Sequence, residues 1–360
     1  MRLEIKFIAS MAKQVPSHKK VAGVIRNQEA LAGRNISLIP LKGGNLNHVW
    51  RASDEHGNTV IAKYAPPFIA KKPEIPLDDS RIHFESRILK AFRDDERLGR
   101  LPGLAIRVPE FRGFDKKENI LLMEDVGDLE NIIDYMFRSS GEAGKMGKEL
   151  GNFIAGLHLQ TFGDQGCREK FNNLPVQETR FEVQYQQCGT FAQKGGMSPK
   201  RAAEVDTHCR ALGNKLMDTG VCLIMGDLWP ESILVDSNSD HATLVLIDWE
   251  MSHYGNPVQD VAHLDAHLWM MQHRCQGEEK RREIGQFQEK FTGQYRKKTE
   301  QDAAFARHVK ERDYAIHYGA EILARTTGSF QAGYLYDGLN CNDKPIQEAV
   351  SHAVRQITAN

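Results

Sequence analysis

The chain of 360 residues lacks a long apolar run and an excess of charge of either sign. Its apolar runs are strand-sized, far below the roughly 20 residues that cross a bilayer, so we expect no membrane segment. Lysine and arginine number 47 against 48 aspartates and glutamates, and the formal net charge of −1 creates no overall attraction to nucleic acid. Any anionic ligand must therefore be held by a local group of residues.

Paired cysteines are also missing. None of the six cysteines belongs to a C-x-x-C pair or a zinc-like group, and their density is far from that of a disulfide-stapled secreted domain. The first residues, MRLEIKFIASMAKQ, place Glu4 inside a short apolar stretch, which disfavours a cleaved signal peptide. We therefore expect reduced thiols and a cytoplasmic location. The cysteines are Cys167, Cys188, Cys209, Cys222, Cys275 and Cys341.

Strand-like segments and turn residues occupy the first part of the chain. ISLIP, HVWRAS and TVIAKYA, between residues 36 and 65, are separated by the turn residues KGGN and DEHGN, which predicts an antiparallel meander. Residues 78–93 place apolar side chains at helical spacing behind an Asp/Ser cap, so a helix is expected there. The apolar run in NILLMEDVGDLE, residues 119–130, predicts a buried strand. We place the end of a small N-lobe, 1–126, at Val126.

Helical patterns dominate the predicted C-lobe, 127–360. The apolar residues of the range 150–157 follow the i, i+3, i+4, i+7 spacing of a core helix. The segment 163–200 is expected to be a mobile loop because its periodicity is weak. Further helices are expected over 258–274, 279–299, 303–327 and 343–357. The expected fold class is α+β, with an antiparallel sheet in the N-lobe and a larger, mainly helical C-lobe.

Two short strands with acids at one end interrupt the helices. In MGDLWPESILVD, residues 225–236, a glycine precedes Asp227 and an apolar run follows, which suggests a loop that presents this carboxylate at the mouth of a sheet. TLVLIDWE, residues 243–250, ends in Asp248 and Glu250. Acids two positions apart on an extended chain point the same way, so these two carboxylates are candidates to share one cation.

Phosphoryl transfer is the chemistry that needs these residue types, because it depends on positioning and charge stabilisation more than on covalent catalysis. Gly43 and Gly44 lie between two strands, where backbone amides can approach phosphates, although a plain hairpin turn explains them better. Lys63 is either a solvent contact of an edge strand or a buried cation, for which Glu85 in the next helix is a candidate partner. Asp227 would accept the proton of a hydroxyl group or orient its oxygen.

The order of these motifs resembles the protein-kinase-like fold, in particular the superfamily of aminoglycoside phosphotransferases, choline kinases and methylthioribose kinases. The resemblance runs from about residue 36 to residue 328. The family's H-G-D-x-x-x-x-N loop is represented by Met225-Gly226-Asp227 and Ser232, and its magnesium-binding aspartate by Asp248. GGNLNHVWR, LLMEDVGD and GAEILARTTG are similar to methylthioribose kinases, whereas the Met-Gly-Asp-Leu-Trp loop is similar to fungal hydroxytryptamine kinases.

The resemblance implies a bilobal kinase that uses ATP and Mg²⁺ to phosphorylate a hydroxyl of a small molecule, with Asp227 as the catalytic residue. Residues 123–126 would form a hinge whose backbone holds adenine. Asp260 would brace the catalytic loop, for which a simple helix cap is the alternative. The implied nucleotide-binding residues are Gly43, Gly44, Asn45, Lys63, Glu85, Met123, Glu124 and Val126, the metal ligands are Ser232, Asp248 and Glu250, and the substrate residues are Trp229 and Arg325.

The acceptor stays open between a methylthioribose-like sugar, indicated by Arg325, and a hydroxylated amine, indicated by Trp229. An aminoglycoside ranks third because it needs a strongly acidic pocket. The alternative to an enzyme is a pseudokinase binding module, suggested by Met225, Ser232 and Ala324, the last of which stands where methylthioribose kinases have the first arginine of a pair. No nucleic-acid or membrane partner is expected, and a homodimer is left open.

Overall fold

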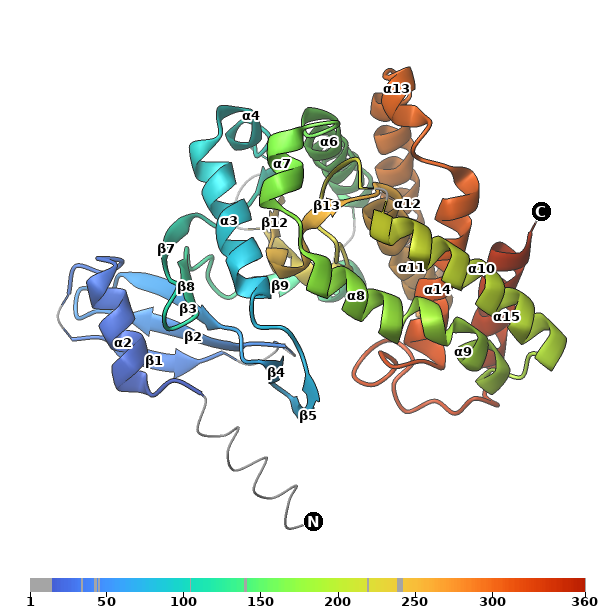
Figure 1. Cartoon of the computed structure of the whole chain (residues 1–360), viewed down its shortest axis with the longest axis horizontal. Coiled ribbons are helices and arrows are strands. Elements are labelled where there is room, and N and C mark those ends of the chain that lie inside the picture. The colour runs from blue at the N-terminus through green and yellow to red at the C-terminus, as the bar shows by residue number, and fades with distance from the viewer. Residues whose placement is uncertain are drawn as a thin grey trace, which may run out of the picture. The chain divides into compact units, whose positions relative to one another are not determined.

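The structure is a computed structural model that describes residues 15–33, 35–41, 44, 46–103, 105–138, 141–218, 220–237 and 242–359. These residues form two compact units, whose helices and strands are labelled in Figure 1. Unit 1 contains the described residues up to Gly99, Val108–Asp128 and Trp249–Met251, and unit 2 contains the rest. The strand-rich part of unit 1 ends at Asp128, close to the boundary expected at Val126. Residues 100–107 were expected in the N-lobe but belong to unit 2, and residues 249–251 were expected in the C-lobe but belong to unit 1. Gly43 and Asn45 lie outside the described residues.

Unit 1 is built on a five-stranded antiparallel sheet, which confirms the predicted meander. The strand order is β1 (Ser37–Pro40), β2 (His48–Ser53), β3 (Thr59–Tyr64), β8 (Ile120–Met123) and β7 (Phe111–Asp115). Side chains alternate between the two faces of a strand, so Trp50, Ala52, Val60 and Ala62 share one buried face. Helix α2 (His18–Asn27), which was not predicted, adds its own apolar residues to this cluster.

Helix α3 (Arg81–Asp94) matches the helix expected over 78–93 and serves the opposite face of the sheet, where Lys63 of β3 contacts its Glu85. A short hairpin of β4 (Phe68–Ile69) and β5 (Lys72–Pro76) precedes it, and the one-turn helix α4 (Glu96–Gly99) follows it. The 3-10 turn η3 (Trp249–Met251) packs on α3, with the ring of Trp249 lying 5.1 Å from that of Phe92. Trp249 is fully buried and is a core residue of unit 1.

Two small sheets in unit 2 contain the predicted acidic strands. One has the order β6 (Ile106–Arg107), β12 (Thr243–Leu246), β11 (Ile233–Asp236) and β9 (Glu130–Asn131). The other pairs β10 (Cys222–Ile224) with β13 (His253–Gly255). The loop 225–232 therefore leaves one sheet and enters the other, which fixes both of its ends.

Helices make up most of unit 2, as expected. They are α5 (Ile132–Arg138), α6 (Ala143–Gln160), α7 (Gln165–Lys170), α8 (Leu174–Val183), α9 (Cys188–Lys194), α10 (Pro199–Asp218), α11 (Val258–Arg274), α12 (Glu278–Thr299), α13 (Ala303–Ala306), α14 (Glu311–Thr326) and α15 (Lys344–Thr358), with 3-10 turns η1 (Tyr185–Gln187) and η2 (Pro230–Ser232). The single helix expected over 303–327 is divided into α13 and α14, because the chain turns at residues 307–310.

The expectation of a mobile loop over 163–200 is wrong. The segment forms α7, α8, η1 and α9 and enters α10, with Tyr185, Cys188 and Phe191 buried in the helical core. Short helices contain too few turns to show a clear apolar period, and packing against other elements stabilises them more than local propensity does. The sequence pattern is therefore weak where the structure is ordered.

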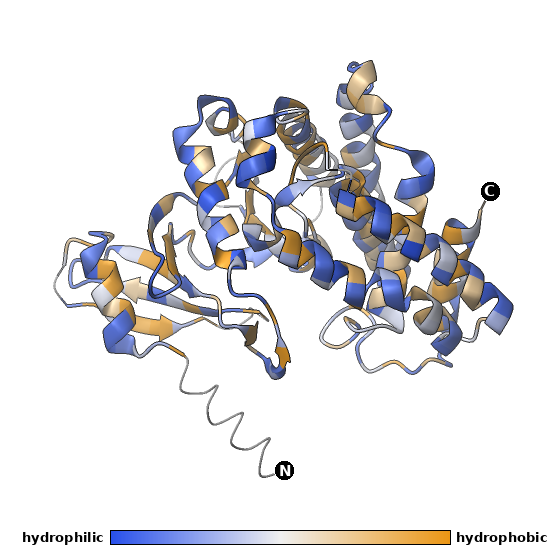
Figure 2. Ribbon diagram, viewed as in Figure 1, coloured by the Kyte–Doolittle hydropathy of each residue, from blue (hydrophilic) through white to orange (hydrophobic). Residues whose placement is uncertain are grey.

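Helix α15 shows how the helical core is built, because Figure 2 shows both hydrophobic and hydrophilic residues along it. Its buried residues are Ile346, Ala349, Val350, Ala353, Val354 and Ile357. Each fully buried valine or isoleucine contributes about 1.5–3 kcal/mol relative to an exposed one. Among the described residues, every helix is too short or too polar to cross a lipid bilayer. All six cysteines are free thiols, five of them buried.

Candidate functional site

Unit 1 buries a complete ion pair between its sheet and α3. The ammonium of Lys63 lies 2.9 Å from Oε2 of Glu85, and the two residues are 3 % and 1 % exposed. Lys63 belongs to β3, which pairs with β2 on one side and β8 on the other, so the alternative of an edge-strand solvent contact is wrong. A buried charge without a partner is strongly unfavourable, which explains why the two residues pair.

The segment expected to be a hinge follows β8 directly. Met123 ends the strand and is buried, while Glu124 accepts and donates hydrogen bonds with Glu110, its amide donating to the Glu110 carbonyl at 2.9 Å. The amide of Val126 has no hydrogen-bond acceptor among the described residues. Between them, Asp125 binds Arg51, whose Nε lies 2.7 Å from Oδ2. Residues 123–126 are thus held by the bonds of Glu124 and Asp125, while the backbone amide of Val126 stays available as a donor.

Glu250 has a different surrounding from the one expected. Its two oxygens accept from Nδ2 of Asn47 at 2.8 and 2.9 Å, and Nε of Arg81 lies 3.1 Å from Oε2. The remaining donors of Arg81 are used within unit 1, on the carbonyls of residues 46, 66 and 78 and on Oδ1 of Asn47. The engagement of both oxygens argues against the predicted role of Glu250 as a metal ligand.

The premise that Asp248 and Glu250 extend from one strand is wrong. Strand β12 ends at Leu246, and Asp248 has a φ of 62°, a left-handed conformation that is uncommon for residues other than glycine. The chain then turns into η3, and Glu250 belongs to unit 1 whereas Asp248 belongs to unit 2. Their sequence spacing therefore does not place the two carboxylates on the same side.

Ser232 and Asp248 lie at the same end of a two-stranded ladder. Ile233 of β11 is opposite Leu246 of β12, and the amide of Ile247 donates to the Ser232 carbonyl at 2.9 Å. The Ser232 hydroxyl donates to the Trp229 carbonyl at 2.8 Å and so closes turn η2. A carboxylate and a hydroxyl are hard oxygen donors of the kind that Mg²⁺ prefers. The Ser232 hydroxyl is buried and also accepts from the Trp229 amide at 3.3 Å, so Asp248 is the better candidate of the two for a magnesium ion.

The loop before Asp227 is held by Asp260 in the first turn of α11. The amides of Met225 and Gly226 donate to the two oxygens of Asp260, each at 2.8 Å, and Nε2 of His158 lies 3.1 Å from Oδ2. Asp260 and Met225 are both fully buried, and Gly226 has a φ of 80°, a conformation that glycine adopts without strain. Asp260 therefore makes hydrogen bonds to the loop rather than to the free amides of its own helix end.

Asp227 is contacted by two residues that sequence reasoning missed. Nη2 of Arg180 lies 2.9 Å from Oδ1 of Asp227, and Nε2 of His263 lies 3.4 Å from the same oxygen. Burial alone would raise the pKa of Asp227, but the hydrogen bond from His263 and the charge of Arg180 together lower it well below its usual value. The carboxylate is thus ionised, and its Oδ2 has no partner among the described residues.

Trp229 and Arg325, the two residues predicted to bind substrate, contact each other. The guanidinium of Arg325 lies 4.7 Å from the ring centre of Trp229, 5.2 Å from that of Phe330 and 5.3 Å from that of Tyr334. Nε of Arg325 donates to Glu321 at 2.7 Å. Cation–π attraction favours such contacts, so Arg325, Trp229, Phe330 and Tyr334 form one aromatic cluster.

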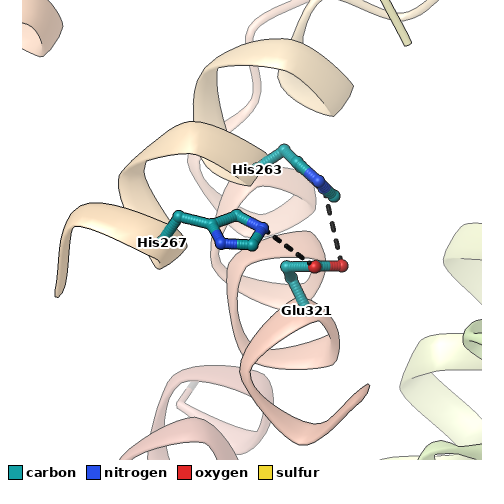
Figure 3. Close-up of side chains that lie close together, drawn as sticks. All are labelled: His263, His267 and Glu321. Carbon is teal, nitrogen blue, oxygen red and sulfur yellow. Dashed lines mark hydrogen bonds and ion pairs between the residues drawn. The ribbon is translucent and has the colours of Figure 1, made fainter. Parts of the chain in front are cut away.

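His263, His267 and Glu321 also lie close together, with both histidines of α11 directed at the carboxylate on α14 (Figure 3). Nε2 of His267 lies 3.1 Å from Oε1 of Glu321, and burial lowers the pKa of His267 to about 3. The three ligand atoms lie within 4.8 Å of one another, the spacing of a metal site. However, Gln184 and Arg325 already donate to Glu321, and Arg180 lies 3.3 Å from Nδ1 of His263, so two guanidinium cations and the hydrogen bonds oppose a metal ion there.

The chain is similar in sequence to known phosphotransferases. The model of the phosphotransferase enzyme family matches residues 37–314. The 4-hydroxytryptamine kinase of Psilocybe cyanescens is 30 % identical over 236 residues, which are 62 % of this chain and 64 % of that protein. The 4-hydroxytryptamine kinase of Psilocybe cubensis is 26 % identical over 238 residues, 62 % of this chain and 65 % of that protein. The match therefore spans less than two thirds of these relatives.

A solved structure supports the fold alone. The choline kinase of Cryptosporidium parvum Iowa II superimposes with a TM-score of 0.52 at 11 % identity, covering 94 % of this chain and 95 % of that one. The antiparallel sheet of unit 1 and the helical unit 2 are thus the two parts of a kinase-like fold, as the motifs predicted.

Proposed function

The chain belongs to the phosphotransferase enzyme family, and from this premise we propose that it transfers the γ-phosphate of ATP to a hydroxyl group of a small molecule. The observation that supports this most is the environment of Asp227. Its loop is tied to Asp260, one carboxylate oxygen is held by Arg180, and Oδ2 is left for an acceptor. A carboxylate prepared in this way can orient a hydroxyl group for attack on phosphorus.

Unit 1 would supply the nucleotide-binding residues. Lys63 would bind phosphate oxygens, and its bond to Glu85 keeps the ammonium from rotating away. The free amide of Val126 is a donor suited to a nitrogen of adenine. Gly44, which precedes β2, would let backbone amides approach the phosphates.

Ser232 and Asp248 of unit 2 would hold Mg²⁺. When bound, this ion neutralises charge on the phosphate oxygens. The left-handed backbone at Asp248 costs about 1–3 kcal/mol and persists only when the surrounding structure enforces it, which is common where a side chain must be aimed at a ligand. Glu250 is not part of this proposal.

The acceptor we propose is a small hydroxylated aromatic amine. The relatives named for such a substrate are 30 % and 26 % identical to this chain over 236 and 238 residues, and Trp229, Phe330 and Tyr334 offer aromatic surface in unit 2. A polycationic aminoglycoside ranks lower, because it needs several acids in one pocket. Of the acids available for this, Glu231, Asp265 and Asp337, Asp265 accepts from Gln288 and lines a cavity with Tyr295 and Tyr314, and Asp337 is exposed.

An ADP-release assay with MgATP tests the proposal. We expect saturable release with 4-hydroxytryptamine or a close analogue, and much weaker release with methylthioribose, choline and kanamycin. Saturation with methylthioribose instead would keep the reaction and change the acceptor. Binding of MgATP in a calorimeter without ADP release for any acceptor would favour the pseudokinase module and refute the proposed activity.

A further inference from the structure

Arg180 connects three parts of unit 2 at the candidate catalytic residue. It lies on α8, in the segment where sequence patterns indicated no ordered structure. Its Nη2 donates to the carbonyl of Gly226 at 2.6 Å and to Oδ1 of Asp227 at 2.9 Å, and its Nη1 lies 3.3 Å from Nδ1 of His263. The side chain is 12 % exposed, so these contacts are made largely out of water.

The segment that carries Arg180 also reaches a second acid of this region. Gln184, the residue that caps the C-terminal end of α8, donates to Oε2 of Glu321 at 2.9 Å. The end of α8 therefore contacts Asp227 through Arg180 and Glu321 through Gln184. Glu321 is buried, whereas the side chain of Asp227 is 24 % exposed and is open to an acceptor.

The two oxygens of Asp227 are therefore unequal. Oδ1 is contacted by both Arg180 and His263, whereas Oδ2 has no partner among the described residues. The terminal torsion of an aspartate is broad and roughly two-fold, and a half-turn only exchanges two equivalent oxygens, so the variable that matters is the direction of the carboxylate plane. Nη2 of Arg180 sets that direction, since it donates both to one carboxylate oxygen and to the backbone carbonyl of Gly226, the preceding residue.

We propose that Arg180 is a positioning residue for phosphoryl transfer, which holds the carboxylate plane of Asp227 in one direction by engaging one oxygen and leaves the other oxygen to the acceptor hydroxyl. The inference rests on the proposed function, because it needs Asp227 to contact the acceptor. It adds a residue outside the kinase motifs, from a helix that follows no motif of its own. Lysine is a poor substitute, because only a guanidinium donates from one planar group to the Gly226 carbonyl, to Oδ1 of Asp227 and to Nδ1 of His263.

In the reaction, the acceptor hydroxyl donates its hydrogen bond to Oδ2 of Asp227. The acceptor oxygen forms a bond to the γ-phosphorus, the bond from that phosphorus to the β,γ-bridging oxygen breaks, and ADP leaves with the bonding electrons. The hydroxyl proton is lost to solvent. Arg180 touches none of the reacting atoms and acts through the orientation of Asp227, which is why we expect it to change kcat and not the binding of MgATP.

Steady-state ADP release by Arg180→Ala, with the best acceptor of the wild-type chain, tests this inference. We expect kcat to fall on the order of 100-fold, the loss typical of a misplaced reacting group, with KM for MgATP within about twofold. Millimolar guanidinium chloride should restore at least a tenfold increase in kcat to Arg180→Ala and none to Asp227→Asn, since only the first variant has a vacated guanidinium site. Arg180→Lys should stay at least tenfold below the wild type.

Arg210→Ala is the matched control, because Arg210 also binds an aspartate, Asp206, but on the exposed surface of α10. It should keep the wild-type kcat and show no response to guanidinium. A kcat of Arg180→Ala within twofold of wild type, or a loss confined to the KM of the acceptor, overturns the inference. If Arg180→Ala does not fold, Arg180→Lys decides by the same criterion. Absence of ADP release by the wild type would instead refute the proposed function.

Discussion

Two buried arginines, one in each unit, bind carboxylates in different ways. Arg81 of unit 1 donates to Glu250, Asn47 and three carbonyls, and both oxygens of Glu250 are occupied. Arg180 of unit 2 binds Asp227 through one oxygen and leaves the other without a partner among the described residues. A fully satisfied buried ion pair stabilises architecture, whereas a pair with one open acceptor is suited to receive a ligand.

Substitution of Asp227 is the most direct test of the difference between the two arginine–carboxylate pairs. Asp227→Asn keeps the size of the side chain but replaces a charged acceptor with an amide, so we expect kcat to fall by about 1,000-fold or more. The affinity for MgATP, measured by calorimetry, should stay within a few fold because Asp227 is not proposed to bind phosphate. A nearly normal rate of ADP release would show that the open oxygen has no catalytic role.

The buried ion pair of Lys63 and Glu85 tests whether a pair whose two charges satisfy each other can also take part in catalysis. Lys63→Met should lower kcat/KM for MgATP by about 100-fold, as loss of one stabilising donor does. It should also lower the free energy of unfolding by about 3–5 kcal/mol, because Glu85 is left as an uncompensated buried charge.

The double variant Lys63→Met/Glu85→Leu separates these two effects. Replacement of both charges by apolar groups of similar volume is often neutral for stability, so thermal unfolding should return toward wild type. Activity should not return, since the ammonium is still missing. Recovery of both properties together would indicate that Lys63 has only a structural role.

Arg81 tests the purely structural side of the comparison. Arg81→Met leaves the buried charge of Glu250 without its cation and several carbonyls without their donor, and we expect the free energy of unfolding to fall by about 3–5 kcal/mol in urea titrations. Arg93→Ala, which removes an exposed pair with Asp94 in the same helix, should change stability little. A larger effect for Arg93 than for Arg81 would contradict the proposed difference between saturated and exposed pairs.

How far the sequence predicts the molecule depends on whether partners are joined by local geometry. The antiparallel meander and α3 follow patterns that repeat within one element. The Lys63–Glu85 contact and the hydrogen bonds of Asp260 to the loop join different elements, and they were expected because the motifs resemble those of kinases. Asn47 and Glu250 are 203 residues apart, and Arg180 and Asp227 are 47 apart. No period connects such residues, so only tertiary packing brings them together.

The same reason explains why the expected extended geometry of Asp248 and Glu250 is wrong. The spacing rule for Asp248 and Glu250 assumes an extended chain, but strand β12 ends before either residue. Asp248 then adopts a left-handed backbone conformation, which the composition of the surrounding sequence does not predict. Local rules thus fail where a backbone conformation is imposed by its surroundings, which is also where ligand-binding side chains are found.

The smallest effect concerns the buried histidine beside the aromatic cluster. Burial lowers the pKa of His267 from 6.5 to about 3 in the folded chain, so between these values the unfolded chain binds a proton at this residue and the folded chain does not. The free energy of unfolding should therefore decrease as the pH falls from 6.5 to 5, by at most about 1.4 kcal/mol per pH unit for this group. His267→Gln keeps a polar side chain but cannot take up the proton, so urea titrations across this range should show a slope reduced by up to one proton. An unchanged slope would mean that His267 is charged in the folded chain, and its hydrogen bond to the ionised Glu321 would then be an ion pair.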